Sequence, residues 1–163
     1  MTAVDAPSLQ EQYLPGNVCF GCGADNPAGL GLRSFAADDG LTAIATWQPG
    51  IAHQAFPGVL CGGVIGTLID CHSGAALALA VRRRDGGWPW SQGPAWATAS
   101  FRVRLLRPAP VDRPLQLSAR VRRLEEARAF VTATLQVDGV DHATGIAEWR
   151  RLRRAFAGLH GAA

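Results

Sequence analysis

The stretch PGVLCGGVIGTLID, residues 57–70, places a glycine pair ahead of an aspartate in an apolar pattern of helical period. Asp70 follows Gly63 by seven residues, almost two helical turns, so both lie on one stripe of the expected helix together with Gly66. A carboxylate in such a stripe costs free energy unless it has a partner or a chemical task. Asp70 is therefore either a general base or nucleophile tuned by partial burial, or a structural group that bonds a neighbouring strand or subunit.

Gly62 and Gly63 stand where this helix begins. The first N–H groups of a helix have no intrahelical partner and its dipole is positive there, so a glycine start suits an anion or a developing oxyanion. Tight packing of a loop is, taken alone, the more common reason for such a pair. Asp70 lies roughly 10 Å along the helix from these amides, and one helix does not easily bring both to one carbonyl carbon. Two antiparallel helices from two subunits do so more easily, so the spacing is compatible with a site shared across a dimer interface.

The elements that must position these residues form an α+β pattern. Apolar residues recur at helical spacing from Gly62 to about Arg83, nearly all round, which predicts a helix wrapped by other structure. Strand-like runs are found at residues 41–49, 98–108, 115–125, 129–139 and 143–154. The links between the last four runs are short, which favours antiparallel neighbours. We therefore expect a curved antiparallel sheet around one long helix.

Length and composition predict one globular domain. The chain has 163 residues, of which 48% are hydrophobic and 18% charged, with a formal net charge of +3. We expect a flexible N-terminal arm at residues 1–15, a single domain at residues 16–156 and a C-terminal tail at residues 157–163. The basic residues form no tail with interleaved aromatic side chains, which argues against nucleic acid as a partner.

The sequence gives no sign of a targeting or membrane-spanning segment. The first 15 residues lack a basic start and an apolar run. The longest apolar stretch, residues 63–81, is broken by Asp70, His72 and Ser73, which predicts a buried helix and a packed or interface histidine. We therefore expect a cytoplasmic protein with reduced cysteines and no membrane partner.

These motifs resemble the hotdog-fold acyl-CoA thioesterases, particularly the PaaI-like (phenylacetate-pathway) branch of the superfamily that also contains 4-hydroxybenzoyl-CoA thioesterases. PGVLCGGVIGTLID is similar to the family's P-G-x-x-H-G-G-x-x-x-x-x-x-D pattern, and SFRVRLLRPAP to its strand ending in arginine–proline. The segment CFGCGADNPAGLGL resembles an N-terminal segment of many members. The resemblance covers about residues 19–152 and implies a hotdog fold, in which a curved antiparallel sheet wraps a long central helix.

The resemblance also implies an activity and the residues that carry it. Asp70 matches the catalytic acid, which activates water or attacks the thioester, and Gly62 matches the glycine whose N–H polarises the thioester carbonyl. Thr98, ten residues before Pro108, falls where related enzymes place a serine or threonine that helps to hold the water. The implied reaction is hydrolysis of an acyl-CoA thioester to free acid and coenzyme A, in a homodimer or a dimer of dimers whose site lies between two subunits.

The candidate substrate-binding residues are His53, Gln54, Phe56, Cys61, Gly63 and Arg107. The first three belong to the loop that touches the acyl group in the family. Arg107 ends a strand beside a proline and is a candidate for the phosphates of coenzyme A, as are the arginines at 82–84. Solvated faces explain these arginines equally well.

Cys61 departs from the family pattern, because related enzymes have histidine there to fix the loop and orient the carbonyl site. A thiol carries no positive charge and donates hydrogen bonds weakly. This departure keeps open a non-catalytic hotdog module that binds an acyl-CoA or an aromatic small molecule. A hotdog hydratase is disfavoured, because the Asp–His spacing of that class is not evident.

Cys19 and Cys22 form a C-x-x-C pair, but a tetrahedral zinc site needs four ligands. There is no second such pair, and Cys61, Cys71 and the histidines stand at no recognisable spacing for completing a site. We therefore expect buried inert thiols, no metal, and no cofactor beyond coenzyme A as part of the substrate. A metal-binding partner protein is the remaining alternative, which bound zinc would support.

Overall fold

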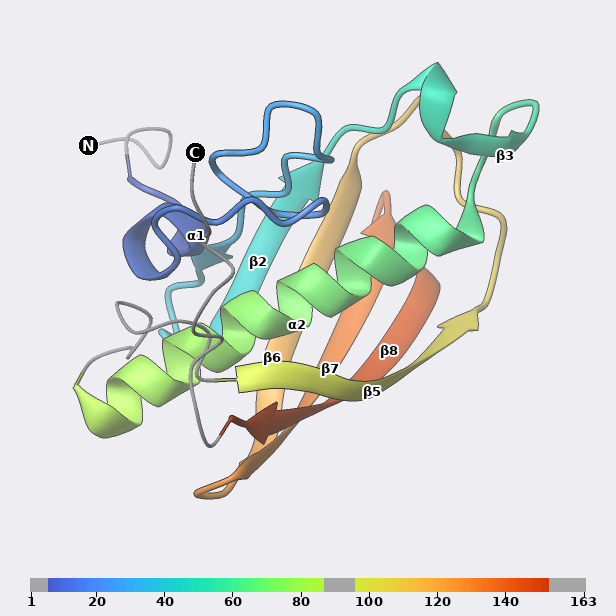
Figure 1. Ribbon diagram of the computed structural model, residues 1–163. Helices are drawn as coiled ribbons and strands as arrows, with labels where there is room; N and C mark the ends of the chain where they lie inside the picture. Colours follow the sequence, from blue (N-terminus) through green and yellow to red (C-terminus); the bar gives the residue numbers. More distant parts are fainter. Residues whose placement is uncertain (1–5, 87–95, 153–163) are drawn as a thin grey trace.

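One long helix lies against a curved sheet in the computed structural model, which describes residues 6–86 and 96–152 (Figure 1). The helix is α2 (Gly62–Asp85). The six-stranded antiparallel sheet has the order β1 (Phe35–Ala36), β2 (Thr42–Trp47), β6 (Leu115–Leu124), β7 (Arg128–Val137), β8 (Val140–Arg151) and β5 (Trp96–Leu105). The shorter elements are α1 (Leu9–Tyr13), the 3-10 turn η1 (Ile51–His53) and the hairpin of β3 (Gln54–Phe56) and β4 (Val59–Leu60). The α+β prediction of one helix wrapped by an antiparallel sheet is confirmed.

The core forms where α2 packs on the sheet. Leu68 and Ile69 are at most 1% exposed, and Val131 on β7 is fully buried beneath the helix. A Cβ atom at Gly145 on β8 would lie 2.4 Å from Ile69 Cγ2, so glycine is what lets the helix approach that strand. By length and composition α2 is apolar enough to cross a membrane, but 67% of its most apolar window is buried inside the fold, as expected of a core helix.

The strand order corrects one expectation. β5 pairs with β8, with Phe101 opposite Ala147, whereas β6 pairs with β2, with Ala119 opposite Ala43. The prediction that the runs joined by residues 106–114 are neighbours is therefore wrong. This link is used by another element: the N–H of Leu60 on β4 donates to the carbonyl of Ala109 at 2.8 Å, and the chain then enters the sheet as β6, between β2 and β7.

Within the flexible arm expected over residues 1–15, the described residues 6–15 contain a short capped helix, α1. Ser8 and Glu11 form a capping box, in which the N–H of Glu11 donates to Ser8 Oγ at 3.3 Å and the N–H of Ser8 donates to the Glu11 carboxylate at 2.7 Å. Leu9 is 2% exposed and Tyr13 is buried, so α1 belongs to the core. The expected domain end at residue 156 and the tail at residues 157–163 lie outside the described residues.

A buried chain of hydrogen bonds ties α1 to α2. Gln10 Nε2 donates to Ser34 Oγ at 3.0 Å, and Ser34 Oγ lies 2.9 Å from His72 Nδ1. His72 Nε2 lies 3.1 Å from the carbonyl of Ala43, which only accepts, so the ring proton is on Nε2 and Ser34 donates to Nδ1. Burial lowers the pKa of His72 to about 4, against the opposing effect of its backbone hydrogen bonds. Of the two environments that the sequence predicts for this histidine, core or interface, His72 has the core one.

Candidate active site

Asp70 and Thr98 meet where α2 passes the edge strand β5. Thr98 Oγ1 donates to Asp70 Oδ1 at 2.9 Å. Thr98 lies at an irregularity in the β5–β8 pairing, between Thr98 and Ser100. The Asp70 side chain is half-buried, and burial raises the pKa of this carboxyl group, while the hydrogen bond from Thr98 opposes that effect. A half-buried carboxylate with one hydroxyl partner is equipped to take a proton or to attack a carbonyl carbon.

Ser73 and Trp149 hold the helix turn that carries Asp70. Ser73 Oγ donates to the Asp70 carbonyl at 2.7 Å and accepts a hydrogen bond from Trp149 Nε1 at 3.0 Å. A Cβ atom at Gly74 would lie 2.9 Å from the Trp149 ring, so the indole lies directly on the helix backbone. Sequence reasoning missed both positioning residues, because Trp149 is 76 residues from Ser73 and no local pattern marks the pair.

Gly62 and Gly63 are the first two residues of α2, as the sequence predicts. Cys61 is the N-cap, and its thiol makes no capping hydrogen bond to the described first turn. The N–H groups of that turn are therefore open to an acceptor. Gly63 is exposed, whereas a Cβ atom at Gly62 would lie 3.0 Å from Leu105 Cδ1 on β5. The helix start thus presents free donors beside an apolar strand end.

The loop before α2 is fixed by His53 and Gln54. The carbonyl of His53 accepts from the N–H of Cys61 at 2.9 Å, and its Nδ1 accepts from the N–H of Gly50 at 2.9 Å. The imidazole also packs against Trp47, with 4.9 Å between ring centroids. Gln54 Oε1 accepts from the N–H of Gly58 at 3.0 Å and so closes the β3–β4 turn. Both side chains are therefore used within the loop.

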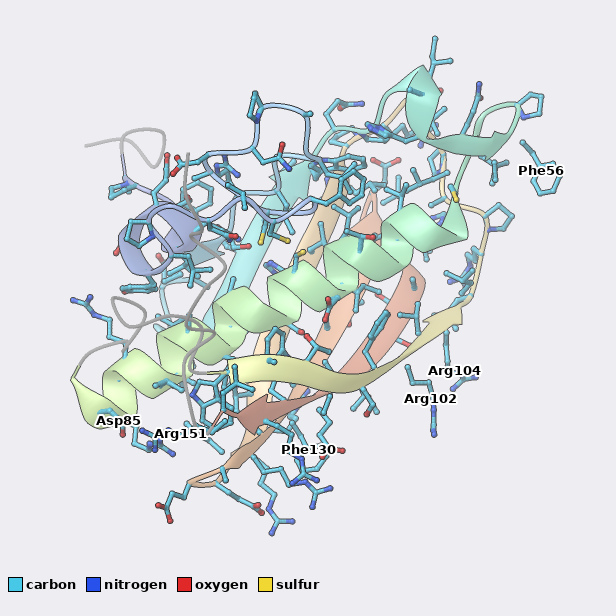
Figure 2. The ribbon with its side chains drawn as sticks, viewed as in Figure 1. Phe56, Asp85, Arg102, Arg104, Phe130 and Arg151 are labelled. Carbon is cyan, nitrogen blue, oxygen red and sulfur yellow. The ribbon has the colours of Figure 1, made fainter. Side chains whose placement is uncertain are left out.

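An open apolar cleft of about 550 Å³ lies at the start of α2. Its lining includes Phe56, Leu60, Gly62, Ile65, Leu105 and Arg107. Phe56 is 71% exposed and projects from the β3 end of the molecule (Figure 2), and the guanidinium of Arg107 donates to the carbonyl of Asp141. Within one chain, Phe56, Gly62 and Arg107 line this cleft. Asp70 and its partner Thr98 lie further along α2 and are not part of the cleft lining.

The arginines at 82–84 are at the opposite end of α2 and have local partners. Arg82 lies over the Tyr13 ring, 5.0 Å from its centroid. Arg83 Nη1 donates to the carbonyl of Gly40 at 2.7 Å, and Arg84 pairs with Asp85. These contacts anchor the helix end, and they leave Arg107 as the candidate cation at the cleft.

Three of the four cysteines gather beside the helix turn that follows Asp70. The Sγ atoms of Cys19, Cys22 and Cys71 all lie within 4.8 Å of one another. The adjacent thiols of Cys22 and Cys71, followed by backbone N–H groups, lower the pKa of the Cys19 thiol to about 2. The sequence placed Cys19 and Cys22 together, but nothing in its spacing assigned Cys71 to them.

Comparison with known proteins identifies the family. The thioesterase superfamily model matches residues 57–154. A thioesterase superfamily protein from Shewanella loihica PV-4 is 27% identical, with a TM-score of 0.58, over 75% of this chain and 91% of that chain. The E. coli PaaI protein from the phenylacetic acid degradation operon is 20% identical, with a TM-score of 0.59, over 77% of this chain and 83% of that chain.

A further thioesterase superfamily protein is 22% identical, with a TM-score of 0.62 over 74% of this chain, which spans 56% of that protein's length. No curated protein matches the chain. The family match extends over more than half of the sequence, and the structural matches share the long helix and curved sheet. The chain therefore belongs to the thioesterase superfamily and has the hotdog fold of that superfamily, which it shares with PaaI.

Proposed function

We propose that this protein hydrolyses the thioester of an acyl-CoA, with Asp70 as general base or nucleophile. The observation that carries the proposal is the hydrogen bond of 2.9 Å from Thr98 to a half-buried Asp70 on the central helix of a thioesterase-superfamily fold. Thr98 orients the carboxylate and helps to hold the attacking water. Its hydroxyl leaves the second carboxylate oxygen available to take a proton from that water.

The start of α2 supplies the complementary half of the reaction. The thioester carbonyl binds at the N–H of Gly62, where an uncapped helix end stabilises the negative charge that develops on the oxygen. The acyl group occupies the apolar cleft beside Phe56 and Leu105, and Arg107 at its mouth contacts a phosphate of coenzyme A. Hydrolysis then releases the free acid and the thiol of coenzyme A.

The two halves come together in a homodimer, which in turn can pair into a dimer of dimers. Within one chain, Asp70 lies roughly 10 Å along the helix from the Gly62 amide, too far for both to reach one carbonyl group. β5 is one of the two edge strands of the sheet, and on it Phe101 is 49% and Leu105 57% exposed. An apolar edge of this kind supports pairing with a second copy, whose α2 brings its Asp70 to the first subunit's Gly62.

The test is a panel of aliphatic and aromatic acyl-CoAs, with loss of thioester followed by chromatography because the chain's own four cysteines react with thiol reagents. We expect Asp70→Asn to lower kcat by about 10²- to 10⁴-fold while the fold is kept. Asp85→Asn is the matched control, since Asp85 lies on the same helix in an exposed pair with Arg84. Equal turnover by Asp70→Asn and the wild type would sink the mechanism.

The second candidate function is a non-catalytic module that binds an acyl-CoA or an aromatic molecule, and Cys61 at the family's histidine position favours it. In this structure, however, the loop that the histidine fixes in related enzymes is held by the backbone of His53, whose carbonyl accepts from Cys61 N–H. Binding of coenzyme A without turnover of any thioester in the panel would select the module.

A further inference from the structure

The thiols of Cys19 and Cys22 in the N-terminal loop lie beside the thiol of Cys71 on α2. Figure 2 shows yellow sulfur atoms between that loop and the helix. The Cys19 and Cys71 Sγ atoms are 3.7 Å apart, and all three sulfurs lie within 4.8 Å of one another. A tetrahedral zinc ion with Zn–S bonds of about 2.3 Å holds its sulfur ligands about 3.8 Å apart. The cluster thus already has nearly the spacing of three corners of a zinc tetrahedron.

The loop that carries Cys19 and Cys22 has a backbone that lets it pack closely against α2 at Cys71. The N–H of Gly23 donates to the carbonyl of Cys19 at 2.8 Å, which closes a tight turn. A Cβ atom at Gly21 would lie 2.4 Å from Cys71 Sγ, so glycine is what allows the turn to lie on the helix at the cysteine itself. Larger residues at position 21 would push Cys19 and Cys22 away from Cys71.

The side-chain amide of Asn17 bonds the backbone of Cys19 and the thiol of Cys22. Asn17 Oδ1 accepts from the N–H of Cys19 at 2.9 Å, and Asn17 Nδ2 donates to Cys22 Sγ at 3.8 Å. Hydrogen-bond donors aimed at sulfur orient thiolate ligands and stabilise their negative charge in metal sites. Asn17 is therefore placed as an outer-shell partner of the cluster.

The three thiols differ in burial, and this difference shows which side of the cluster faces solvent. Cys22 is buried, Cys71 is half-buried and Cys19 is exposed. No fourth histidine, cysteine or carboxylate belongs to the group among the residues that the structure describes. A metal held here would have three protein ligands and one position facing solvent, where water completes the tetrahedron.

We propose that Cys19, Cys22 and Cys71 bind one zinc ion as three thiolates, with a water molecule in the fourth position. Three soft thiolates at tetrahedral spacing select zinc among the common divalent cations. A disulfide needs sulfurs about 2.0 Å apart and would leave the third thiol unused. The zinc ion ties the N-terminal loop to α2 at the residue after Asp70, which is a task separate from the chemistry proposed for that carboxylate.

Metal content tests the proposal on the full chain without a histidine tag, purified under a reductant, incubated with zinc and dialysed. We expect about one zinc per chain in the wild type and in Cys61→Ser, the matched control, because Cys61 is the one cysteine outside the cluster. We expect a loss of at least tenfold in zinc content in Cys22→Ser and Cys71→Ser. Cobalt in place of zinc should give the intense visible bands of a tetrahedral site with thiolate charge transfer. Equal zinc content in all four proteins, or none in the wild type, overturns the proposal.

Alkylation of the wild type provides a second measurement that does not depend on how the variants fold. Because Cys19 is exposed, it should react with iodoacetamide in the zinc-free protein and be protected after zinc is added, as read by mass spectrometry of its peptide. Cys61 should react at the same rate in both samples. Equal reaction of Cys19 with and without zinc overturns the proposal, as does a Cys19–Cys71 disulfide that forms under air in the presence of zinc.

Discussion

Thr98 Oγ1 donates a hydrogen bond of 2.9 Å to Asp70 Oδ1, and this contact joins the edge strand β5 to the first half of the central helix α2. The two residues are 28 positions apart in the sequence. The contact depends on the β5–β8 pairing, in which Thr98 is opposite Trp149, the indole that also holds the Asp70 turn through Ser73. A carboxylate placed in this way has one orientation relative to whatever binds beside it.

Removal of the Thr98 hydroxyl should therefore reduce turnover rather than substrate binding. We expect Thr98→Val to lower kcat on the best acyl-CoA by about 10- to 100-fold, the value of a hydrogen bond to a charged group. Thr98→Ser keeps the donor and should retain most of the activity. Steady-state kinetics on the two variants checks this, and a Thr98→Val enzyme as fast as Thr98→Ser would contradict it.

Mixing two inactive variants tests whether the site is shared between subunits. Asp70→Asn lacks the acid, and Gly62→Val fills the helix start, where even a Cβ atom lies 3.0 Å from Leu105 Cδ1. If each site takes Gly62 from one subunit and Asp70 from the other, unfolding and refolding the mixture should restore about a quarter of wild-type activity through hybrid dimers. A site contained within one chain would leave the mixture as inactive as its components.

Arg107 should affect recognition of the coenzyme and not of the acyl group. Its guanidinium is exposed at the cleft and anchored on the Asp141 carbonyl. We expect Arg107→Ala to raise KM for an acyl-CoA about tenfold, the value of one charge-assisted phosphate contact, and to leave KM for the acyl-pantetheine unchanged. Arg113→Ala is the control, because Arg113 is exposed and pairs with Asp138. Equal effects on both substrates would show that Arg107 does not contact a phosphate.

His72 should make the fold sensitive to acid. The unfolded histidine has a pKa of about 6.5, whereas burial lowers the pKa of His72 to about 4 in the folded protein. As the pH falls, the unfolded state therefore binds a proton before the folded state does. The contribution of neutral His72 to the free energy of unfolding is complete above pH 6.5, falls as the pH drops, and levels off below pH 4. The free energy of unfolding should fall by about 3 kcal/mol between pH 6.5 and pH 4.

Urea denaturation at a series of pH values measures this loss, with His72→Leu as the comparison. The variant should be less stable at pH 7, because it removes the acceptor of the Ser34 hydroxyl proton and the ring N–H that donates to the Ala43 carbonyl. Its stability should nevertheless fall less than that of the wild type between pH 6.5 and pH 4. Parallel curves for the two proteins would exclude His72 as the titrating group.

Gly145 should be intolerant of a side chain. A Cβ atom there would lie 2.4 Å from Ile69 Cγ2, so Gly145→Ala should lower the free energy of unfolding by about 1–3 kcal/mol. The cost should shrink in an Ile69→Ala background, which removes the clashing group. A double-mutant cycle of unfolding free energies measures this coupling, and strictly additive costs would contradict the packing described.

Local patterns in the sequence were sufficient to predict the elements but not their partners. The helical period and the glycine start predicted α2 within two residues of its end at Asp85, and the alternation of apolar residues predicted the long strands. The pairing of β5 with β8 was missed, because a short link suggests adjacency and nothing local shows that residues 106–114 run from the edge strand β5 to the inner strand β6. Antiparallel register is decided by contacts between distant residues.

In the candidate site, too, the sequence shows residues that are related by local spacing but not contacts between distant parts of the chain. The spacing of Gly62, Gly63 and Asp70 on one helix is visible in the sequence, since 3.6 residues per turn fixes their relation. Asp70 is supported by Ser73 on α2 and Trp149 on β8. No spacing in the sequence relates these two residues to each other. Cys71 was similarly invisible as a partner of Cys19, 52 residues earlier, until the loop was placed on the helix.

The buried link from Gln10 through Ser34 to His72 has a consequence for where this protein begins as a folding unit. The superfamily model starts at residue 57, yet two of the three members of this link lie before that point. A chain trimmed to residues 57–154 would keep His72 in the core while losing Ser34 and the strand that carries Ala43. The part of the chain that can fold on its own therefore begins well before residue 57, where the match to the superfamily model begins.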